Sequence, residues 1–202
     1  MLAVLAASAT YAQTPVGTDE VQEDWELVIR DTSPDETAPQ IAAIISPIES
    51  IDAEYGVLEL NHTTQPDYVD GGIQLQRWYG DDVMSYCPPT AHDRLNTAGE
   101  TIKFTMTMKL TGTNLVFGVI NGKSQTWGDF GGTTGNWKSQ TAANYANLNR
   151  YDRSTSVTHT RIGFASNLVQ TFQQTHVRYY INGTLVKTDA TPLVAYDGSD
   201  ND

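Results

Sequence analysis

Two amides and an indole on one predicted strand have the chemistry of a carbohydrate-binding surface. Gln74, Gln76 and Trp78 occupy every second position, so an extended backbone places all three on one face and Ile73 and Leu75 on the other. Amides exchange hydrogen bonds with hydroxyl groups, and an indole ring stacks on the apolar face of a sugar. The candidate ligand-binding residues are therefore Gln74, Gln76, Trp78, Asn121, Trp127 and Asp129. The alternative is that the tryptophans complete the core, because Trp is highly buried on average.

Carboxylates near the C-terminal end of the sequence could hold a calcium ion. Asp197, Asp200 and Asp202 lie in the segment DGSDND, which resembles the start of an aspartate-rich Ca²⁺ loop. No glutamate follows them to complete such a loop, so the alternative is a solvated acidic tail. Ca²⁺ is thus the cofactor to test, although the sequence assigns no set of ligands to it.

The single cysteine limits the chemistry further. Cys87 cannot form an intrachain disulfide, and one cysteine excludes Cys-x-x-Cys redox centres and cysteine-based zinc sites. It precedes Pro88 and Pro89, a context that predicts an inert thiol in a loop.

The net charge is strongly negative, at −12 for the formal charges at pH 7. Binding to nucleic acid requires clustered lysines and arginines, and an anionic membrane surface repels such a chain. We therefore expect no binding to nucleic acid. We also expect no membrane insertion, because no stretch is long and apolar enough to span a bilayer.

The two ends of the chain differ in composition from its middle. Residues 1–12 (MLAVLAASATYA) are apolar and rich in small side chains, like a signal peptide, so we expect a secreted or cell-surface protein. Residues 13–24 form an acidic lead-in that we expect to be flexible, and residues 196–202 form an acidic tail. Residues 25–195 are long enough for one core and predict a single domain.

Alternating hydrophobicity predicts an all-β fold. In the clearest strand Ile102, Phe104 and Met106 share one face, while threonines and lysines share the other. The predicted strands are 25–30, 54–61, 72–79, 100–110, 114–121, 156–165 and 176–189, and the apolar run 41–51 is ambiguous. The Gly- and Asn-rich segment 129–149 predicts a long loop. Short strands without helical periodicity indicate a two-sheet antiparallel β-sandwich.

The Asn-Gly dipeptide at positions 182–183 predicts a tight hairpin within the last of these segments. A two-residue turn fixes the register of both strands and places Arg178 opposite Lys187. The same register places His176 opposite Asp189. It therefore predicts that His176 pairs with a carboxylate rather than acting in catalysis.

The second half of the chain resembles the concanavalin A-like lectin and glucanase superfamily, including laminin-G-type modules. The segments ETIKFTMTMKL, TNLVFGVING, TWGDFGG and RYYINGTLVKTD carry the resemblance, which extends over roughly residues 55–191. It implies a jelly-roll arrangement of the two sheets. The superfamily includes lectins, glycosidases, lyases and adhesion modules, so the fold alone does not imply one function.

Two catalytic patterns of that superfamily are incomplete here. Laminarinase-type hydrolases carry Glu-x-Asp-x-Glu on one strand, whereas this chain has Ser50 before Asp52 and Glu54. Jelly-roll alginate lyases combine Gln-x-His with an arginine-rich strand, and only Gln174 and His176 match. We interpret both segments as chance similarities.

These patterns favour a secreted, non-catalytic binding or adhesion module, with a glycan or another extracellular ligand as its partner. The alternative is a structural subunit of an extracellular surface layer, filament or matrix that assembles with itself, since a Thr-, Asn- and Gly-rich β chain would suit that role. A polysaccharide hydrolase or lyase is the third hypothesis, so the sequence leaves catalysis open.

Overall fold

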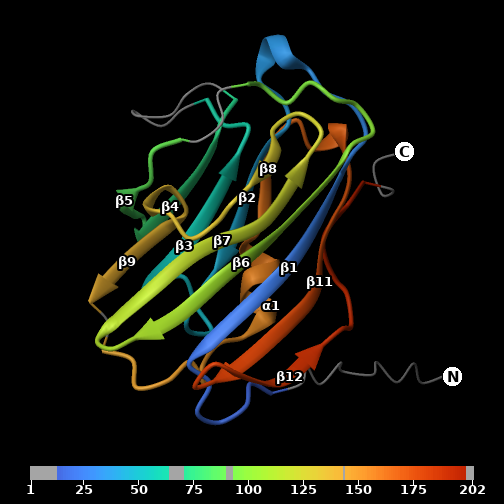
Figure 1. The fold of residues 1–202 in the computed structure, drawn as a ribbon. Helices are drawn as coiled ribbons and strands as arrows, with labels where there is room; N and C mark the ends of the chain where they lie inside the picture. Colours follow the sequence, from blue (N-terminus) through green and yellow to red (C-terminus); the bar gives the residue numbers. More distant parts are fainter. Residues whose placement is uncertain (1–12, 64–70, 90–92, 143, 199–202) are drawn as a thin grey trace, which may run out of the picture.

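The computed structural model of the protein describes residues 13–63, 71–89, 93–142 and 144–198. The signal-peptide-like segment 1–12 and two of the calcium candidates, Asp200 and Asp202, lie outside these ranges. Two antiparallel sheets pack face to face in the described ranges, which confirms the predicted all-β sandwich (Figure 1). No helix in these ranges has the length and apolar character needed to cross a membrane.

The larger sheet has eight strands. They are β1 (Glu20–Ile29), β6 (Thr101–Thr111), β7 (Asn114–Ser124), β8 (Gly128–Phe130), β9 (Lys138–Ala142), β11 (Val169–Ile181), β12 (Thr184–Asp189) and β13 (Leu193–Asp197). Their order across the sheet is β12-β11-β1-β6-β7-β8, with β13 also paired to β11 and β9 also paired to β7.

The smaller sheet has five strands and carries the site described below. Across the sheet they are β10 (Arg161–Phe164), β2 (Gln40–Ile45), β3 (Glu54–Leu60), β4 (Ile73–Tyr79) and β5 (Asp82–Tyr86). The helix α1 (Arg153–His159) contacts β2 and leads directly into β10. Three short 3₁₀ helices complete the described elements, at Pro34–Glu36, Gly135–Trp137 and Ser166–Leu168.

The main core lies between the two sheets and follows from the period-2 pattern of the strands. Every second residue of β1 is buried, and Trp25 packs against Phe172 with ring centroids 5.1 Å apart. A second, smaller cluster lies on the outer face of the smaller sheet and comprises Ala42, Ile44, Tyr55 and Val57, with Ile51 and Trp78 packed against it. One sheet therefore buries side chains on both of its faces.

The structure corrects the predicted start of the first strand. β1 begins at Glu20 rather than at Trp25, so part of the segment predicted as a flexible lead-in is paired with both β6 and β11. The apolar alternation was obscured because an interior position of this strand holds a carboxylic acid, Glu23, which is fully buried.

Two predictions in the second half of the chain were also wrong. The predicted strand 156–165 is instead the end of α1 followed by the short strand β10. The capping signal was missed: the Asp152 carboxylate accepts a hydrogen bond from the Ser154 amide at 2.9 Å. The predicted long loop 129–149 contains β9, which pairs with β7.

The hairpin register is right at the turn and wrong beyond it. Ile181 pairs with Thr184 as predicted, but a bulge between Tyr179 and Tyr180 shifts the register by one residue. Asp189 therefore lies opposite Val177 and not opposite His176. Its carboxylate forms an ion pair with Arg153 at 2.9 Å instead.

Candidate active site

A small pocket opens on the outer face of the smaller sheet, with a volume of about 50 Å³. Side chains from β2, β3, β4, β10, the end of α1 and the turn before β3 line it: Ala42, Ile44, Ile51, Tyr55, Val57, Glu59, Trp78, His159 and Arg161. Most of these are apolar, and Glu59 is only 3% exposed. The pocket thus combines an apolar wall with one deeply placed carboxyl group and two basic side chains.

The strand register explains how these residues come together. Glu59 on β3 lies beside Ala42 on β2, and Ala42 lies beside Arg161 on β10. Since side chains on neighbouring strands at paired positions point to the same face, the three form one row across the sheet. The middle residue has only a methyl group, which leaves space between Glu59 and Arg161.

The electrostatics of Glu59 set it apart from an ordinary surface carboxylate. Burial raises its pKa to about 7, and the positive charge of Arg161 opposes that rise in part. The Nε2 atom of His62 lies 3.0 Å from a Glu59 carboxylate oxygen. Burial, and then the charge of Arg161, lower the pKa of His62. The carboxyl group can therefore exchange a proton near neutral pH.

Aromatic side chains form the other wall of the pocket and are held by hydrogen bonds. Tyr55 and Trp78 stack with ring centroids 6.3 Å apart, and the Tyr55 hydroxyl donates to the Gly80 carbonyl at 2.8 Å. The Trp78 indole N–H donates to the Gln76 side-chain oxygen at 2.8 Å. This wall is consequently rigid, as a binding surface for an apolar group should be.

Three of the residues predicted to bind a ligand lie on this face, but two of them are not accessible. Gln74 and Gln76 are each 1% exposed. The Gln76 amide donates to the Gln74 side-chain oxygen at 2.9 Å, and the Gln74 amide donates to the Cys87 carbonyl at 2.9 Å. The two amides therefore hold Trp78 in place, and only Trp78 lines the pocket.

The structure does not bring the other three predicted residues to this pocket. Asn121, Trp127 and Asp129 belong to the β7–β8 region of the larger sheet. The Trp127 indole N–H donates to the Asp93 carbonyl at 2.7 Å, and its ring packs on the main core. Asp129 is exposed, 3.4 Å from Lys123.

The remaining sequence candidates have structural partners. Ser50 donates a 2.6 Å hydrogen bond to Asp52 in a turn before β3, and Glu54 pairs with Arg77 at 2.8 Å. The Cys87 thiol is buried and donates to the Lys138 carbonyl at 3.3 Å, and burial raises its pKa.

No cluster of three or more His, Cys, Asp and Glu side chains that could hold a metal occurs in the described part of the chain. Asp197 is the last residue of β13, and its two predicted partners fall outside that part.

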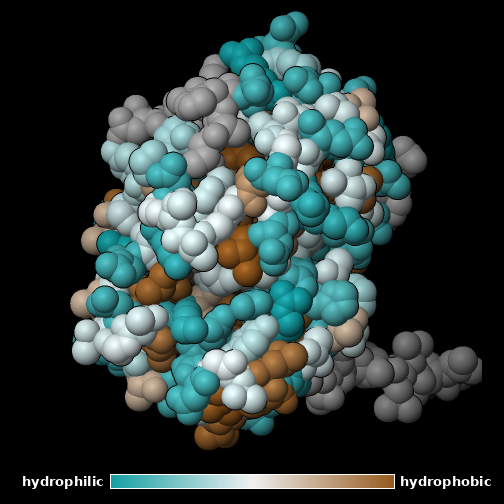
Figure 2. All heavy atoms as spheres, in the orientation of Figure 1, coloured by the Kyte–Doolittle hydropathy of each residue, from teal (hydrophilic) through white to brown (hydrophobic). Residues whose placement is uncertain are grey.

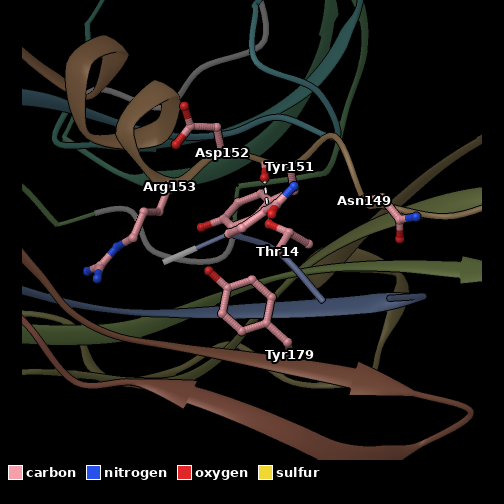
Figure 3. Close-up of a pocket in the computed structure, with 7 residues that line it drawn as sticks. Thr14, Asn149, Tyr151, Asp152, Arg153 and Tyr179 are labelled. Carbon is pink, nitrogen blue, oxygen red and sulfur yellow. Dashed lines mark hydrogen bonds between the residues drawn. The ribbon is translucent and has the colours of Figure 1, made fainter. Parts of the chain in front are cut away.

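A larger pocket of about 340 Å³ lies between the start of α1 and β11 (Figure 3). Figure 3 shows Tyr151 and Thr14 above Tyr179, with Arg153 extending away from α1. The three nitrogens of the Arg153 guanidinium already bond to Gln174, Thr191 and Asp189, at 2.8, 2.9 and 2.9 Å. The Arg153 guanidinium is therefore not free to bind a ligand in this pocket.

Below that pocket Glu23 is fully buried in the core. It accepts hydrogen bonds from Ser156 at 2.6 Å, Tyr151 at 2.8 Å and Trp25 at 2.9 Å. Burial still raises its pKa to about 7. Because its oxygens are occupied and enclosed, Glu23 joins α1 to the larger sheet and cannot reach a substrate.

The outer face of the larger sheet is mostly hydrophilic (Figure 2). Its charges are paired across neighbouring strands: Glu20 with Lys109 at 2.7 Å, Asp24 with Arg178 at 2.6 Å and Glu26 with Lys103 at 2.8 Å. The pocket around Glu59 is the candidate active site because it combines a buried acid with an opening beside it.

Sequence reasoning overlooked Glu59, although a signal was present. The segment YGVLEL is apolar except for this residue, which lies between Leu58 and Leu60. A lone carboxylic acid in an otherwise apolar strand predicts either an edge position or a buried acid with an altered pKa.

Comparison with known proteins found no matching family model and no matching curated protein. Two solved structures of scytalido-glutamic peptidase with transition-state analogues are similar to the chain, at 14% and 12% identity. They cover 92% and 89% of this chain and 86% and 84% of theirs, with TM-scores of 0.40 and 0.38. SCP-B, a member of the Eqolisin family of peptidases in complex with the tripeptide Ala-Ile-His, is 13% identical. The match covers 90% of this chain and 84% of that one, with a TM-score of 0.32.

The structure corrects the predicted function. The prediction of a non-catalytic, carbohydrate-binding adhesion module was wrong, because two of the three side chains on the strand face where it began are buried. The buried amides of Gln74 and Gln76 show why: the sequence pattern placed them on one face but could not show that this face is covered.

Proposed function

We propose that the chain is a hydrolase that uses Glu59 as a general acid and base and acts on peptide bonds. The observation that carries the proposal is the Glu59 carboxyl group, which lies deep in an apolar pocket with a pKa of about 7. Peptides are the substrate class of the similar solved structures and are therefore the first substrates to test.

The proposed reaction is the attack of water on the peptide carbonyl. The pocket volume of about 50 Å³ accommodates a water molecule beside Glu59. The ionised carboxylate takes a proton from this water as its oxygen bonds to the carbonyl carbon. The protonated Glu59 then gives that proton to the amine nitrogen while the carbon–nitrogen bond breaks. A pKa of about 7 suits both transfers, because neither protonation state is strongly preferred.

In this scheme His62 is a positioning residue. Its ring nitrogen lies 3.0 Å from a Glu59 carboxylate oxygen and orients that group in the pocket. The stacked Tyr55 and Trp78 provide an apolar surface for the substrate on one side of the carboxyl group.

The test is peptide hydrolysis by the full chain between pH 4 and 8, followed by mass spectrometry of a mixed peptide library. The substitution Glu59→Gln removes the proton transfer while it keeps the shape of the side chain. We expect it to lower kcat by about 100-fold or more. The matched control is Glu49→Gln, because Glu49 is a surface carboxylate paired with Arg150 at 2.6 Å.

The control variant should hydrolyse peptides at the rate of the unmodified protein. Absence of hydrolysis by the unmodified chain over the whole pH range would refute the proposal. So would a Glu59→Gln variant that is as active as the unmodified chain.

A further inference from the structure

We infer that this pocket recognises a carboxylate group of its substrate, which binds to Arg161 and His159 on the side opposite the aromatic wall. The inference rests on the proposed function and names its substrate class. The substrates are peptides with a free carboxylate, at the C-terminus or on an acidic side chain, close to the bond that is cleaved.

The first observation is that Arg161 differs from the other arginines. Within the described ranges each of the others bonds to a carboxylate or to a carbonyl oxygen: Arg30, Arg77, Arg94, Arg150, Arg153 and Arg178. In the same ranges the Arg161 guanidinium forms no ion pair and no hydrogen bond. Arg161 is exposed and lines the pocket, so in a chain with 24 acidic and 12 basic side chains its guanidinium is available to an external anion.

The second observation is that hydrogen bonds anchor the backbone of the segment that carries both side chains to the pocket wall. His159 is the last residue of α1 and Arg161 is the first residue of β10. Thr160 joins them: its hydroxyl accepts a hydrogen bond from the Ile44 amide at 3.0 Å, and its own amide donates to the Ser156 carbonyl at 2.9 Å. The helix–strand junction is thereby attached to β2, which fixes the backbone positions from which the two side chains reach the pocket.

The third observation is that the nearby carboxyl group does not neutralise Arg161. Glu59 contacts His62 at 3.0 Å, and its raised pKa shows that burial outweighs the attraction of Arg161. Below pH 7 the row from Glu59 to Arg161 therefore carries an uncompensated positive charge. The methyl group of Ala42 leaves the space between them open to a ligand.

The shape and chemistry of the pocket favour a carboxylate over larger anions. A guanidinium binds a carboxylate through two parallel hydrogen bonds, and an imidazole can donate a third. The volume of about 50 Å³ holds only a few heavy atoms, and Ile44 and Val57 contribute apolar wall for the adjoining carbon. The substrate carboxylate would thus lie on one side of Glu59 and the aromatic wall on the other. The peptide bond would lie between the substrate carboxylate and the aromatic wall.

The experiment measures binding to the Glu59→Gln variant, so that no substrate is consumed. Four peptides are titrated by calorimetry at pH 6: acetyl-Ala-Ala-Ala and its amide, and the amides of acetyl-Ala-Glu-Ala and acetyl-Ala-Gln-Ala. The first pair tests a C-terminal carboxylate and the second an acidic side chain. We expect about tenfold tighter binding of the carboxylate form in at least one pair.

Three further substitutions in the Glu59→Gln background assign the preference to the pocket. Arg161→Gln should abolish it, and Arg161→Lys should keep part of it, because the charge remains without the two parallel hydrogen bonds. Ala42→Leu should weaken all binding by filling the space beside Glu59. Arg150→Gln is the matched control and should leave the preference unchanged, because Arg150 pairs with Glu49 on the surface.

Equal affinity for the carboxylate and amide forms in both pairs would overturn the inference, and so would a preference that persists in Arg161→Gln. The proposed function fails separately. A carboxylate preference that depends on Arg161, in a protein that hydrolyses no peptide, would support the binding site and refute the hydrolase. Cleavage of amide and carboxylate peptides at equal rates would support the hydrolase and refute the carboxylate-binding site.

Discussion

At the scale of single residues, the two buried glutamates show that a raised pKa alone does not identify an active site. Burial raises the pKa of both Glu23 and Glu59 to about 7. Glu23 has three hydrogen-bond donors around it and is enclosed in the core. Glu59 lines a pocket instead. Glu59 is therefore a candidate catalytic acid because it adjoins a pocket, whereas the enclosed Glu23 has a structural role.

The strand that carries Glu59 depends on one glycine. A Cβ atom at Gly56 would lie 2.8 Å from the Phe117 ring, closer than real Cβ contacts, so Gly56→Ala should destabilise the protein by about 2 kcal/mol. Urea unfolding measures the effect. Gly135→Ala is the control, because a Cβ there meets nothing within 4 Å. Equal stability of the two variants would show that the sheets have room to separate at Gly56.

At the scale of elements, α1 and β10 bring cationic and hydrogen-bonding groups to the smaller sheet. The helix spans only seven residues, Arg153–His159. A helix this short depends on capping and on tertiary contacts rather than on its own propensity. Its first residue is held by the ion pair of Arg153 with Asp189, and its end is held by Thr160. The position of Arg161 therefore depends on how both ends of the helix are anchored.

The N-terminal cap of α1 allows the contribution of one end of the helix to stability to be measured. Asp152 accepts hydrogen bonds from the Ser154 amide at 2.9 Å and the Ser154 hydroxyl at 2.6 Å. We expect Asp152→Ala to reduce the free energy of unfolding by about 1 kcal/mol, and Asp152→Asn to retain most of it. Chemical denaturation of both variants is the measurement. If Asp152→Asn loses as much as Asp152→Ala, the negative charge matters and the cap geometry does not.

At the scale of the whole molecule, buried acids connect the stability of the sandwich to pH. The unfolded chain releases the Glu23 proton near pH 4.5, whereas the folded protein holds it until about pH 7. A raised folded-state pKa contributes stability that is complete below pH 4.5 and is lost as the pH rises to 7. Glu26 behaves in the opposite way, because its hydrogen bond from Lys103 lowers its pKa. The stability that Glu26 contributes is present above its unfolded pKa and is lost as the pH falls.

The comparison of two variants isolates these effects. Relative to Glu23→Gln, the unmodified protein should lose about 3 kcal/mol of stability between pH 4.5 and 7. Relative to Glu26→Gln, it should lose none over that range. Unfolding free energies measured at several pH values provide the check. A difference between the protein and Glu23→Gln that does not change with pH would mean that Glu23 is ionised in the folded state.

Much of the fold was determined by the sequence alone. The alternation in residues 101–110 and the Asn-Gly turn at 182–183 are local signals. They predicted the strand that became β6, the hairpin and the two-sheet class, because side-chain direction along a strand has a period of two whatever its neighbours are. The start of β1 was misread because a buried acid, Glu23, interrupts the apolar alternation of that strand. The helix α1 was missed because its signal is the cap at Asp152 and not a hydrophobic period.

Only the tertiary structure decided where the chemistry lies. Gln74 and Gln76 were assigned to one face correctly, but whether that face is covered depends on residues far away in the sequence. Glu59, Ala42 and Arg161 meet because β2, β3 and β10 are neighbours in one sheet, although four strands of the larger sheet, β6 to β9, lie between Glu59 and Arg161 along the chain. The register between strands and the burial of a sheet face depend on contacts between residues far apart in the sequence. The local pattern of polar and apolar residues does not determine these contacts. The sequence presents Glu59 as a lone acid in an apolar strand, but only folding brings it together with Arg161 in one pocket.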